Sequence, residues 1–110
     1  MRRSKYNAKP VKIDGLSFDS KKEARRYGEL KLMEKAGEIG LLKFHPRYSL
    51  DINGVHICDY EADFSYVPKE WEYRVCDREV VEDVKGYRTD VYKLKKRLML
   101  AIYEINVRET

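Results

Sequence analysis

The stretch that decides the fold is residues 80–86, which have the sequence VVEDVKG. Alternate side chains of a strand point to opposite faces, so Asp83 and Lys85 share one face while Glu82 lies on the other. At the usual rise per residue, Asp83 and Lys85 are about 7 Å apart. The run Val80–Lys85 therefore predicts a strand whose apolar part ends in an acid and a base.

A second acid borders another predicted strand. The Asn53-Gly54 pair is a strong signal for a type I′ turn, which predicts flanking strands over Arg47–Ile52 and Val55–Val67. Asp63 lies toward the end of the second of these strands. If that strand pairs with the VVEDVKG strand, Asp63 faces Asp83, and two carboxylates and a lysine converge.

A third acid lies in a predicted helix. Ser20 has the position of an N-cap, Glu23 completes a capping box, and Gly37 ends the helix over residues 21–36. The apolar stripe of this helix consists of Ala24, Tyr27, Leu30 and Met33. Glu23 projects close to the middle of that stripe, where an acid needs a partner or a metal. Its side chain is therefore either a capping group or a ligand.

The other elements complete a mixed α/β pattern. Asp14-Gly15 predicts a first hairpin. The pattern of residues 68–79 is compatible with either a strand or a loop. Thr89 or Asp90 caps a final helix over 91–103, and a short strand follows near Ile105 and Val107. The predicted apolar stripe of the final helix is Val91, Leu94, Leu98 and Ile102, with Lys93 and Lys96 on its opposite side. This order predicts a mixed β-sheet flanked by few helices.

Length and composition indicate one domain over residues 13–110, preceded by a basic arm over residues 1–12. The chain has 110 residues, of which 43% are hydrophobic and 38% charged. No apolar run approaches the roughly 18 residues that span a membrane, and no leader pattern is visible. Two cysteines without metal or redox spacing, and two scattered histidines, predict neither disulfides nor a zinc site. We therefore expect a cytoplasmic protein.

The net charge of +4 conceals an uneven distribution. Residues 1–12 contain five bases and no acid, and residues 84–97 contain six bases and one acid. Residues 51–83 between them contain ten acids and three bases. Two basic segments around an acidic middle are typical of a metal-binding pocket that meets a phosphate backbone.

The predicted cluster of acids suits a hard divalent cation. Mg²⁺ takes oxygen ligands, keeps several waters, and is held by one or two carboxylates together with phosphate oxygens. Such an ion lowers the pKa of a bound water and makes it a nucleophile toward phosphorus. A neighbouring lysine orients that water or stabilises the charge that develops.

Three blocks of the sequence resemble the PD-(D/E)XK nuclease superfamily. These blocks are residues 18–27 (FDSKKEARRY), 62–64 (ADF) and 80–86 (VVEDVKG), in that order. Within the superfamily the chain is most similar to a small, poorly characterised phage-encoded endonuclease-like family, over most of its length. The resemblance implies a restriction-endonuclease-like fold and hydrolysis of DNA phosphodiesters with Mg²⁺ or Mn²⁺ in a phage or its bacterial host.

The resemblance also implies roles for particular residues. Asp63 matches the first aspartate of the motif, Asp83 its second acid and Lys85 its lysine, while Glu23 matches a first-helix glutamate. The backbone carbonyl of Val84 is a further expected metal ligand. No proline precedes Asp63, and Glu82 beside Asp83 leaves open which acid enters the site, although parity with Lys85 favours Asp83.

The expected partner is DNA. Arg88, Lys93, Lys96, Arg2 and Arg3 are the predicted phosphate contacts. A short chain has little room for base reading, so branched or junction DNA is the first substrate to test. Cutting both strands requires a homodimer, and Leu100 is a candidate contact. The alternative is a catalytically inactive DNA-binding accessory protein with the same fold.

Overall fold

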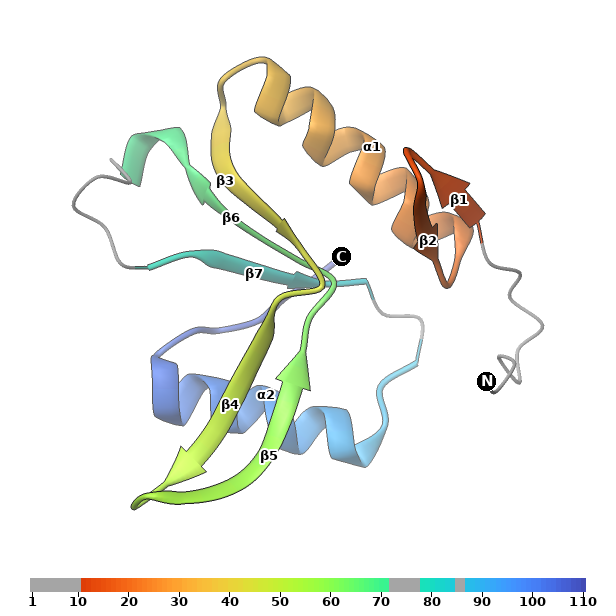
Figure 1. Ribbon diagram of the computed structural model, residues 1–110. Helices are drawn as coiled ribbons and strands as arrows, with labels where there is room; N and C mark the ends of the chain where they lie inside the picture. Colours follow the sequence, from red (N-terminus) through yellow and green to blue (C-terminus); the bar gives the residue numbers. More distant parts are fainter. Residues whose placement is uncertain (1–10, 72–77, 85–86) are drawn as a thin grey trace.

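The computed structural model describes residues 11–71, 78–84 and 87–110 (Figure 1). The elements, in chain order, are β1 (Val11–Ile13), β2 (Leu16–Phe18), α1 (Lys21–Lys35), β3 (Ile39–Phe44), β4 (Arg47–Ile52), β5 (Val55–Glu61), β6 (Phe64–Pro68), the 3₁₀ turn η1 (Lys69–Trp71), β7 (Val80–Asp83), α2 (Asp90–Tyr103) and β8 (Arg108–Glu109).

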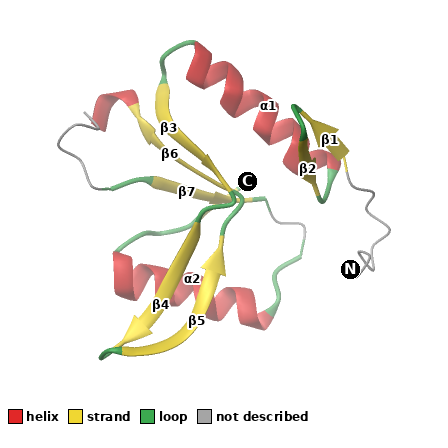
Figure 2. Ribbon diagram, in the orientation of Figure 1, coloured by secondary structure: helices red, strands yellow, loops and turns green. Residues whose placement is uncertain are grey.

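A four-stranded sheet with the order β3-β6-β7-β8 forms the centre of the fold. Its strands pair antiparallel except for β7 and β8, which are parallel. Helix α1 and the β1–β2 hairpin pack on one side of the sheet, and α2 and the β4–β5 hairpin pack on the other (Figures 1 and 2). The predicted mixed α/β sheet flanked by helices is confirmed.

Helix α1 begins and ends where its capping residues predict. The Ser20 hydroxyl accepts a hydrogen bond from the Glu23 backbone N–H at 3.1 Å, and Gly37 follows the helix with a φ of +79°. The Glu23 carboxylate accepts in return from the backbone N–H of Asp19 at 2.9 Å. Ala24, Tyr27 and Leu30 are buried in the core, as the apolar stripe predicts.

Both predicted hairpins form around their turn pairs. Asp14-Gly15 and Asn53-Gly54 have positive φ at both positions, which is the geometry of a type I′ turn. The single strand predicted over Val55–Val67 was wrong, because the chain leaves β5 after Glu61 and begins β6 at Phe64. The two strands belong to different sheets, and Asp63 lies in the break between them.

The sequence did not predict strand β3. Polar and apolar residues do not alternate along residues 39–44. The pairing of this strand with β6 is irregular too, with a register shift between Gly40 and Lys43. Leu41 within this shift has a φ of +53° and an exposed side chain. A bulged strand loses the period of two on which its recognition depends.

Helix α2 is capped by Thr89, whose hydroxyl accepts from the backbone N–H of Tyr92 at 3.1 Å. Half of its predicted apolar stripe is confirmed, because Leu98 and Ile102 pack against the core, whereas Val91 and Leu94 are 62% and 58% exposed. Tyr92 and Met99 are buried, so the packed face is rotated toward these two residues. Lys96 therefore lies on the packed side of the helix and not on the opposite side.

The ends of the chain differ from the predicted boundaries in small ways. Residues 1–10 of the expected basic arm lie outside the described residues, whereas Lys12 is part of β1. The last strand begins at Arg108, slightly later than predicted. Within the described ranges, neither helix has the length and apolar character needed to cross a bilayer.

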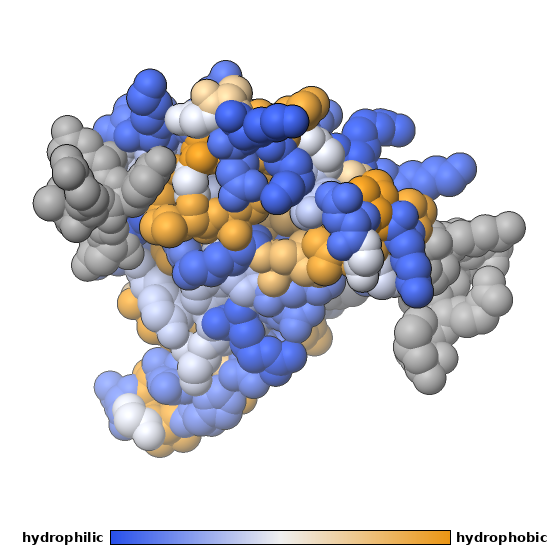
Figure 3. All heavy atoms as spheres, turned by 45° about the horizontal axis from the view of Figure 1, so that its top comes forward, coloured by the Kyte–Doolittle hydropathy of each residue, from blue (hydrophilic) through white to orange (hydrophobic). Residues whose placement is uncertain are grey.

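Polar and charged side chains cover much of the face shown in Figure 3. Apolar side chains are exposed at the far end of the β4–β5 hairpin, where Ile52, Val55 and Ile57 are 43%, 59% and 51% accessible.

Candidate metal centre

Two connections of the chain cross beside the end of β7. The link from β3 to β4 meets the break between β5 and β6, where the His45 N–H donates to the Asp63 carbonyl at 3.0 Å and the Ala62 N–H donates to the Pro46 carbonyl at 3.0 Å. The Asp63 N–H in turn donates to the Glu82 carbonyl at 3.1 Å. The strands converge at this point in the middle of Figure 1.

Asp63 and Asp83 face each other at this crossing. Phe64 pairs with Glu82 in the β6–β7 register, which places the preceding Asp63 opposite Asp83. Their side chains interact electrostatically, and the Asp63 Oδ2 accepts a hydrogen bond from the Val84 backbone N–H at 2.7 Å. The predicted juxtaposition of the two carboxylates is confirmed.

Glu23 joins the two aspartates from the first turn of α1. Glu23 is 4% exposed, and its carboxylate interacts with that of Asp63. One carboxylate oxygen caps the helix through the Asp19 N–H, while the other lies 3.2 Å from His45 Nε2. The two roles that the sequence left open for Glu23 are therefore compatible, because each uses a different oxygen.

His45 is the site residue that the sequence analysis missed. Glu23, His45 and Asp63 each offer a ligand atom, and these atoms all lie within 4.8 Å of one another. The histidine has no motif spacing to mark it, and it follows a strand that the sequence did not reveal. The one local sign is the His45-Pro46 pair, which suggests a corner but not its position beside Glu23.

The structure separates the two acids of the Glu82-Asp83 pair by the face of β7 to which each side chain points. Glu82 points to the α1 face, where Arg26 Nε and Nη2 donate to its two oxygens at 2.8 and 2.7 Å. The Tyr66 hydroxyl also donates to Glu82. Burial by itself raises the pKa of Glu82, but the hydrogen bonds from Arg26 and Tyr66 outweigh it and hold that pKa below its ordinary value. Asp83 points to the opposite face of β7, where it accepts a hydrogen bond from the Tyr60 hydroxyl. It neighbours Asp63 but lies outside the group formed by Glu23, His45 and Asp63.

Crowding of carboxylates perturbs Asp63. Burial, followed by the hydrogen bond and the negative charge of Glu23, raises the pKa of Asp63 to about 6. The bond from the Val84 N–H acts in the opposite direction but does not cancel the shift. Asp63 thus carries its negative charge at an energetic cost that a bound cation would offset.

We expect Asp63→Asn to change how stability depends on pH in the absence of metal. The pKa of Asp63 is raised in the folded state from 3.8 to about 6, so the folded protein binds this proton more tightly than the unfolded chain. That stabilisation is complete below about pH 4 and is lost as the pH rises through about 6. Urea midpoints of the wild type in chelator should fall over this range, and Asp63→Asn should flatten the fall.

Asp59→Asn, which alters a half-exposed carboxylate on β5, is the matched control and should keep the wild-type slope. An unchanged slope in Asp63→Asn would assign the titration to a different group.

The remaining predicted residues fall into three groups. Lys85, Arg2 and Arg3 lie outside the described residues. Arg88 and Lys96 both donate to Glu109, at 2.9 and 3.1 Å, so their charges are already engaged by an acid. Lys93 is exposed on α2, and Val84 is next to the cluster at the end of β7.

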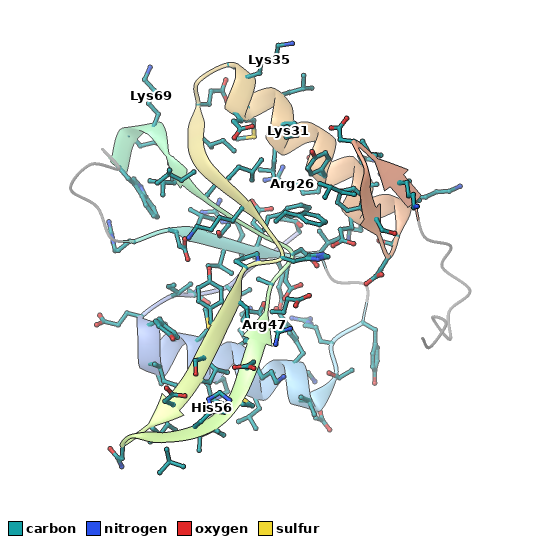
Figure 4. The ribbon with its side chains drawn as sticks, in the orientation of Figure 1. Arg26, Lys31, Lys35, Arg47, His56 and Lys69 are labelled. Atoms are coloured by element: carbon teal, nitrogen blue, oxygen red, sulfur yellow. The ribbon has the colours of Figure 1, made fainter. Side chains whose placement is uncertain are left out.

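A hollow of about 490 Å³ lies beside the cluster, between β5 and the start of α2. Tyr60 connects the two, because its ring lines the hollow while its hydroxyl bonds Asp83. The lining residues are Arg47, Asp59, Tyr60, Glu61, Thr89, Val91, Tyr92 and Lys95. Arg47, labelled in Figure 4, is paired there with Asp59 and Glu61.

A family model described as a protein of unknown function (DUF1064) matches residues 3–110. The chain belongs to this family. The matched region includes Glu23, His45 and Asp63, the neighbouring Asp83, and the strands that position them. No curated protein and no solved structure matches the chain.

Proposed function

We propose that the protein is a metal-dependent endonuclease that hydrolyses DNA phosphodiester bonds with Mg²⁺ or Mn²⁺. The observation that carries this proposal is the convergence of Glu23, Asp63 and Asp83 at the end of β7. Glu23 comes from α1, Asp83 from β7 and Asp63 from the break between β5 and β6, and Asp63 interacts with each of the other two. Their resemblance to the acids of the PD-(D/E)XK motif supports the same assignment.

The donor set fits a hard divalent cation. Carboxylate oxygens are the ligands that Mg²⁺ and Mn²⁺ take in proteins, and burial together with the neighbouring Glu23 raises the pKa of Asp63. Asp63, Asp83 and the carbonyl of Val84 would hold the ion, with Glu23 as a further ligand. When bound, such an ion activates water and neutralises charge on the phosphate under attack.

Other groups of the chain hold these carboxylates in place. The Tyr60 hydroxyl orients Asp83, and the Val84 N–H orients Asp63. The Asp19 N–H fixes one oxygen of Glu23. Preorganisation of this kind lowers the cost of assembling a site when the substrate arrives. Lys85 follows Asp83 by two residues, a spacing that puts both side chains on the same face of an extended strand. It is the proposed group that stabilises the developing negative charge.

The DNA backbone would approach along the side that carries the hollow. Arg47 and Lys95 line the hollow. Lys93 lies on α2 together with Lys95, and Arg88 lies just before the start of α2. Arg2 and Arg3 are proposed to add phosphate contacts through the basic arm. Branched or junction DNA is the proposed substrate, and a homodimer would supply one site for each strand.

A cleavage panel tests the function directly. The purified chain is incubated with linear, flapped, forked and four-way DNA in Mg²⁺, in Mn²⁺ and in chelator. We expect metal-dependent nicking, strongest on a branched form. Salt-dependent DNA binding without nicking in either metal would replace the endonuclease with the inactive DNA-binding accessory protein, and absence of salt-dependent binding would reject both.

A further inference from the structure

We propose that His45 is a nitrogen ligand of the metal in this centre, and that the centre therefore binds Mn²⁺ in preference to Mg²⁺. The inference rests on the proposed function only in placing a divalent cation between Glu23 and Asp63. It goes further because it adds a ligand of a different chemical type, which none of the three sequence blocks contains.

The positions of the donor atoms fit a common ion. His45 Nε2 is 3.2 Å from the Glu23 Oε2, and the ligand atoms of Glu23, His45 and Asp63 lie within 4.8 Å of one another. Two ligands at about 2.2 Å from one octahedral ion are roughly 3 Å apart when adjacent and about 4.4 Å apart when opposite. Small side-chain shifts therefore suffice to close the three donors around a cation.

The imidazole is held in this place by its surroundings. Its backbone N–H donates to the Asp63 carbonyl at 3.0 Å, which couples the position of the histidine to that of the aspartate. The Phe44 ring stacks on the imidazole with centroids 4.0 Å apart. Such constraints restrict the ring to the orientation that directs Nε2 at Glu23.

The second ring nitrogen of His45 also lies near a carboxylate. His45 Nδ1 lies 3.9 Å from the Glu61 carboxylate, on the side away from Glu23. Histidines that bind metals almost always donate their other N–H to a carboxylate, carbonyl or water, which fixes the tautomer that ligates. Glu61 at the end of β5 is the nearest such carboxylate, and a small side-chain shift would bring its Oε2 within hydrogen-bond distance of Nδ1 while Oε1 stays paired with Arg47.

Nitrogen among the ligands changes which cation is favoured. Mg²⁺ prefers an all-oxygen octahedron that includes several waters, whereas first-row transition ions accept imidazole readily. A site of carboxylates plus one imidazole should therefore bind Mn²⁺ more tightly than Mg²⁺. The alternative is that His45 merely hydrogen-bonds Glu23 and takes no part in metal binding.

Pulsed EPR of bound Mn²⁺ separates these alternatives. The full chain is loaded with Mn²⁺ and examined for hyperfine coupling to a ligand ¹⁴N. The chain contains two histidines, so uniform ¹⁵N-histidine labelling should convert the signal to ¹⁵N in the wild type itself. This measurement needs no variant, and it stays decisive if substitution of His45 impairs folding.

Two matched variants identify the histidine. His45→Gln should abolish the nitrogen coupling and reduce the ratio of Mn²⁺ to Mg²⁺ affinity, measured by calorimetry, by about tenfold or more. His56→Gln is the control, because His56 also lies between two carboxylates, 2.7 Å from Asp51 and 3.4 Å from Asp59. It belongs to the outer part of the β4–β5 hairpin, away from the crossing (Figure 4), and should leave both readouts unchanged.

The outcomes also distinguish this inference from the proposed function. Bound Mn²⁺ without nitrogen coupling would overturn the role of His45, while metal-dependent DNA cleavage would still support the endonuclease. Nitrogen coupling from His45 without cleavage of any DNA would confirm the ligand and reject the endonuclease. Absence of Mn²⁺ binding would overturn the inference about His45, and cleavage in Mg²⁺ would then decide the endonuclease.

Discussion

Replacement of Asp83 by asparagine is expected to reduce DNA cleavage by about 10³-fold or more, because metal-based charge stabilisation contributes several kcal/mol. The amide oxygen can still accept the hydrogen bond that the Tyr60 hydroxyl donates. The substitution also removes one of three neighbouring negative charges. The folded state should therefore remain at least as stable as the wild type in chelator. Cleavage rate and thermal midpoint, measured together, separate a lost ligand from a lost fold.

Glu82→Gln is the matched control for this experiment, since it alters the adjacent acid on the opposite face of β7. It should retain cleavage at temperatures where the variant is folded, because Glu82 is bonded to Arg26 and Tyr66 and not to the cluster. A cleaving Asp83→Asn variant together with an inactive but folded Glu82→Gln variant would reverse the assignment of the site.

Glu82→Ala is expected to cost about 3–5 kcal/mol of unfolding free energy, the usual effect of removing one partner from a buried ion pair. Glu82 is fully buried, and its loss leaves Nε and Nη2 of Arg26 and the Tyr66 hydroxyl without their acceptor, while Nη1 keeps the exposed Glu29. The guanidinium projects from α1 toward the sheet (Figure 4), one turn beyond Glu23, so this pair also holds the helix over β7. Urea unfolding gives the free energy.

Apolar replacement of the whole group tests that explanation. A variant combining Arg26→Met, Glu82→Leu and Tyr66→Phe leaves no unpaired charge or hydroxyl, and it should recover most of the lost stability. Leu32→Ala, an exposed position on the same helix, should change stability little. A triple variant as unstable as Glu82→Ala would show that the buried charges are not the cause.

Local interactions account for much of what could be predicted. The turn pairs Asp14-Gly15 and Asn53-Gly54 and the cap at Ser20 act over two to four residues, so the sequence shows them directly. The alternation of side chains along β7 is also a local property, and it places Asp83 and Glu82 on opposite faces of the strand. The juxtaposition of Asp63 and Asp83 followed once the pairing of their strands was assumed.

The errors arose where packing between distant segments decides the outcome. The apolar residues of α2 suggest one face, but the helix presents Tyr92 to the core, and its hydroxyl donates to Glu109 at 2.9 Å. Exposed Val91 and Leu94 show that hydrophobicity along a helix does not by itself choose which face is covered. The break at Asp63 likewise depends on backbone bonds to Pro46 and Glu82 on other strands.

By itself, the sequence determined the mixed α/β class, both type I′ hairpins, the capped first helix with its inward-facing Glu23, and the parity that selects Asp83. Each of these depends on contacts between residues near in the chain, or on the period of one strand or helix. Only the tertiary structure placed His45 beside Glu23, because that contact joins residues 22 positions apart across the unpredicted strand β3. A ligand from a loop between two strands can be recognised only in the folded structure, because distant segments of the chain come together there.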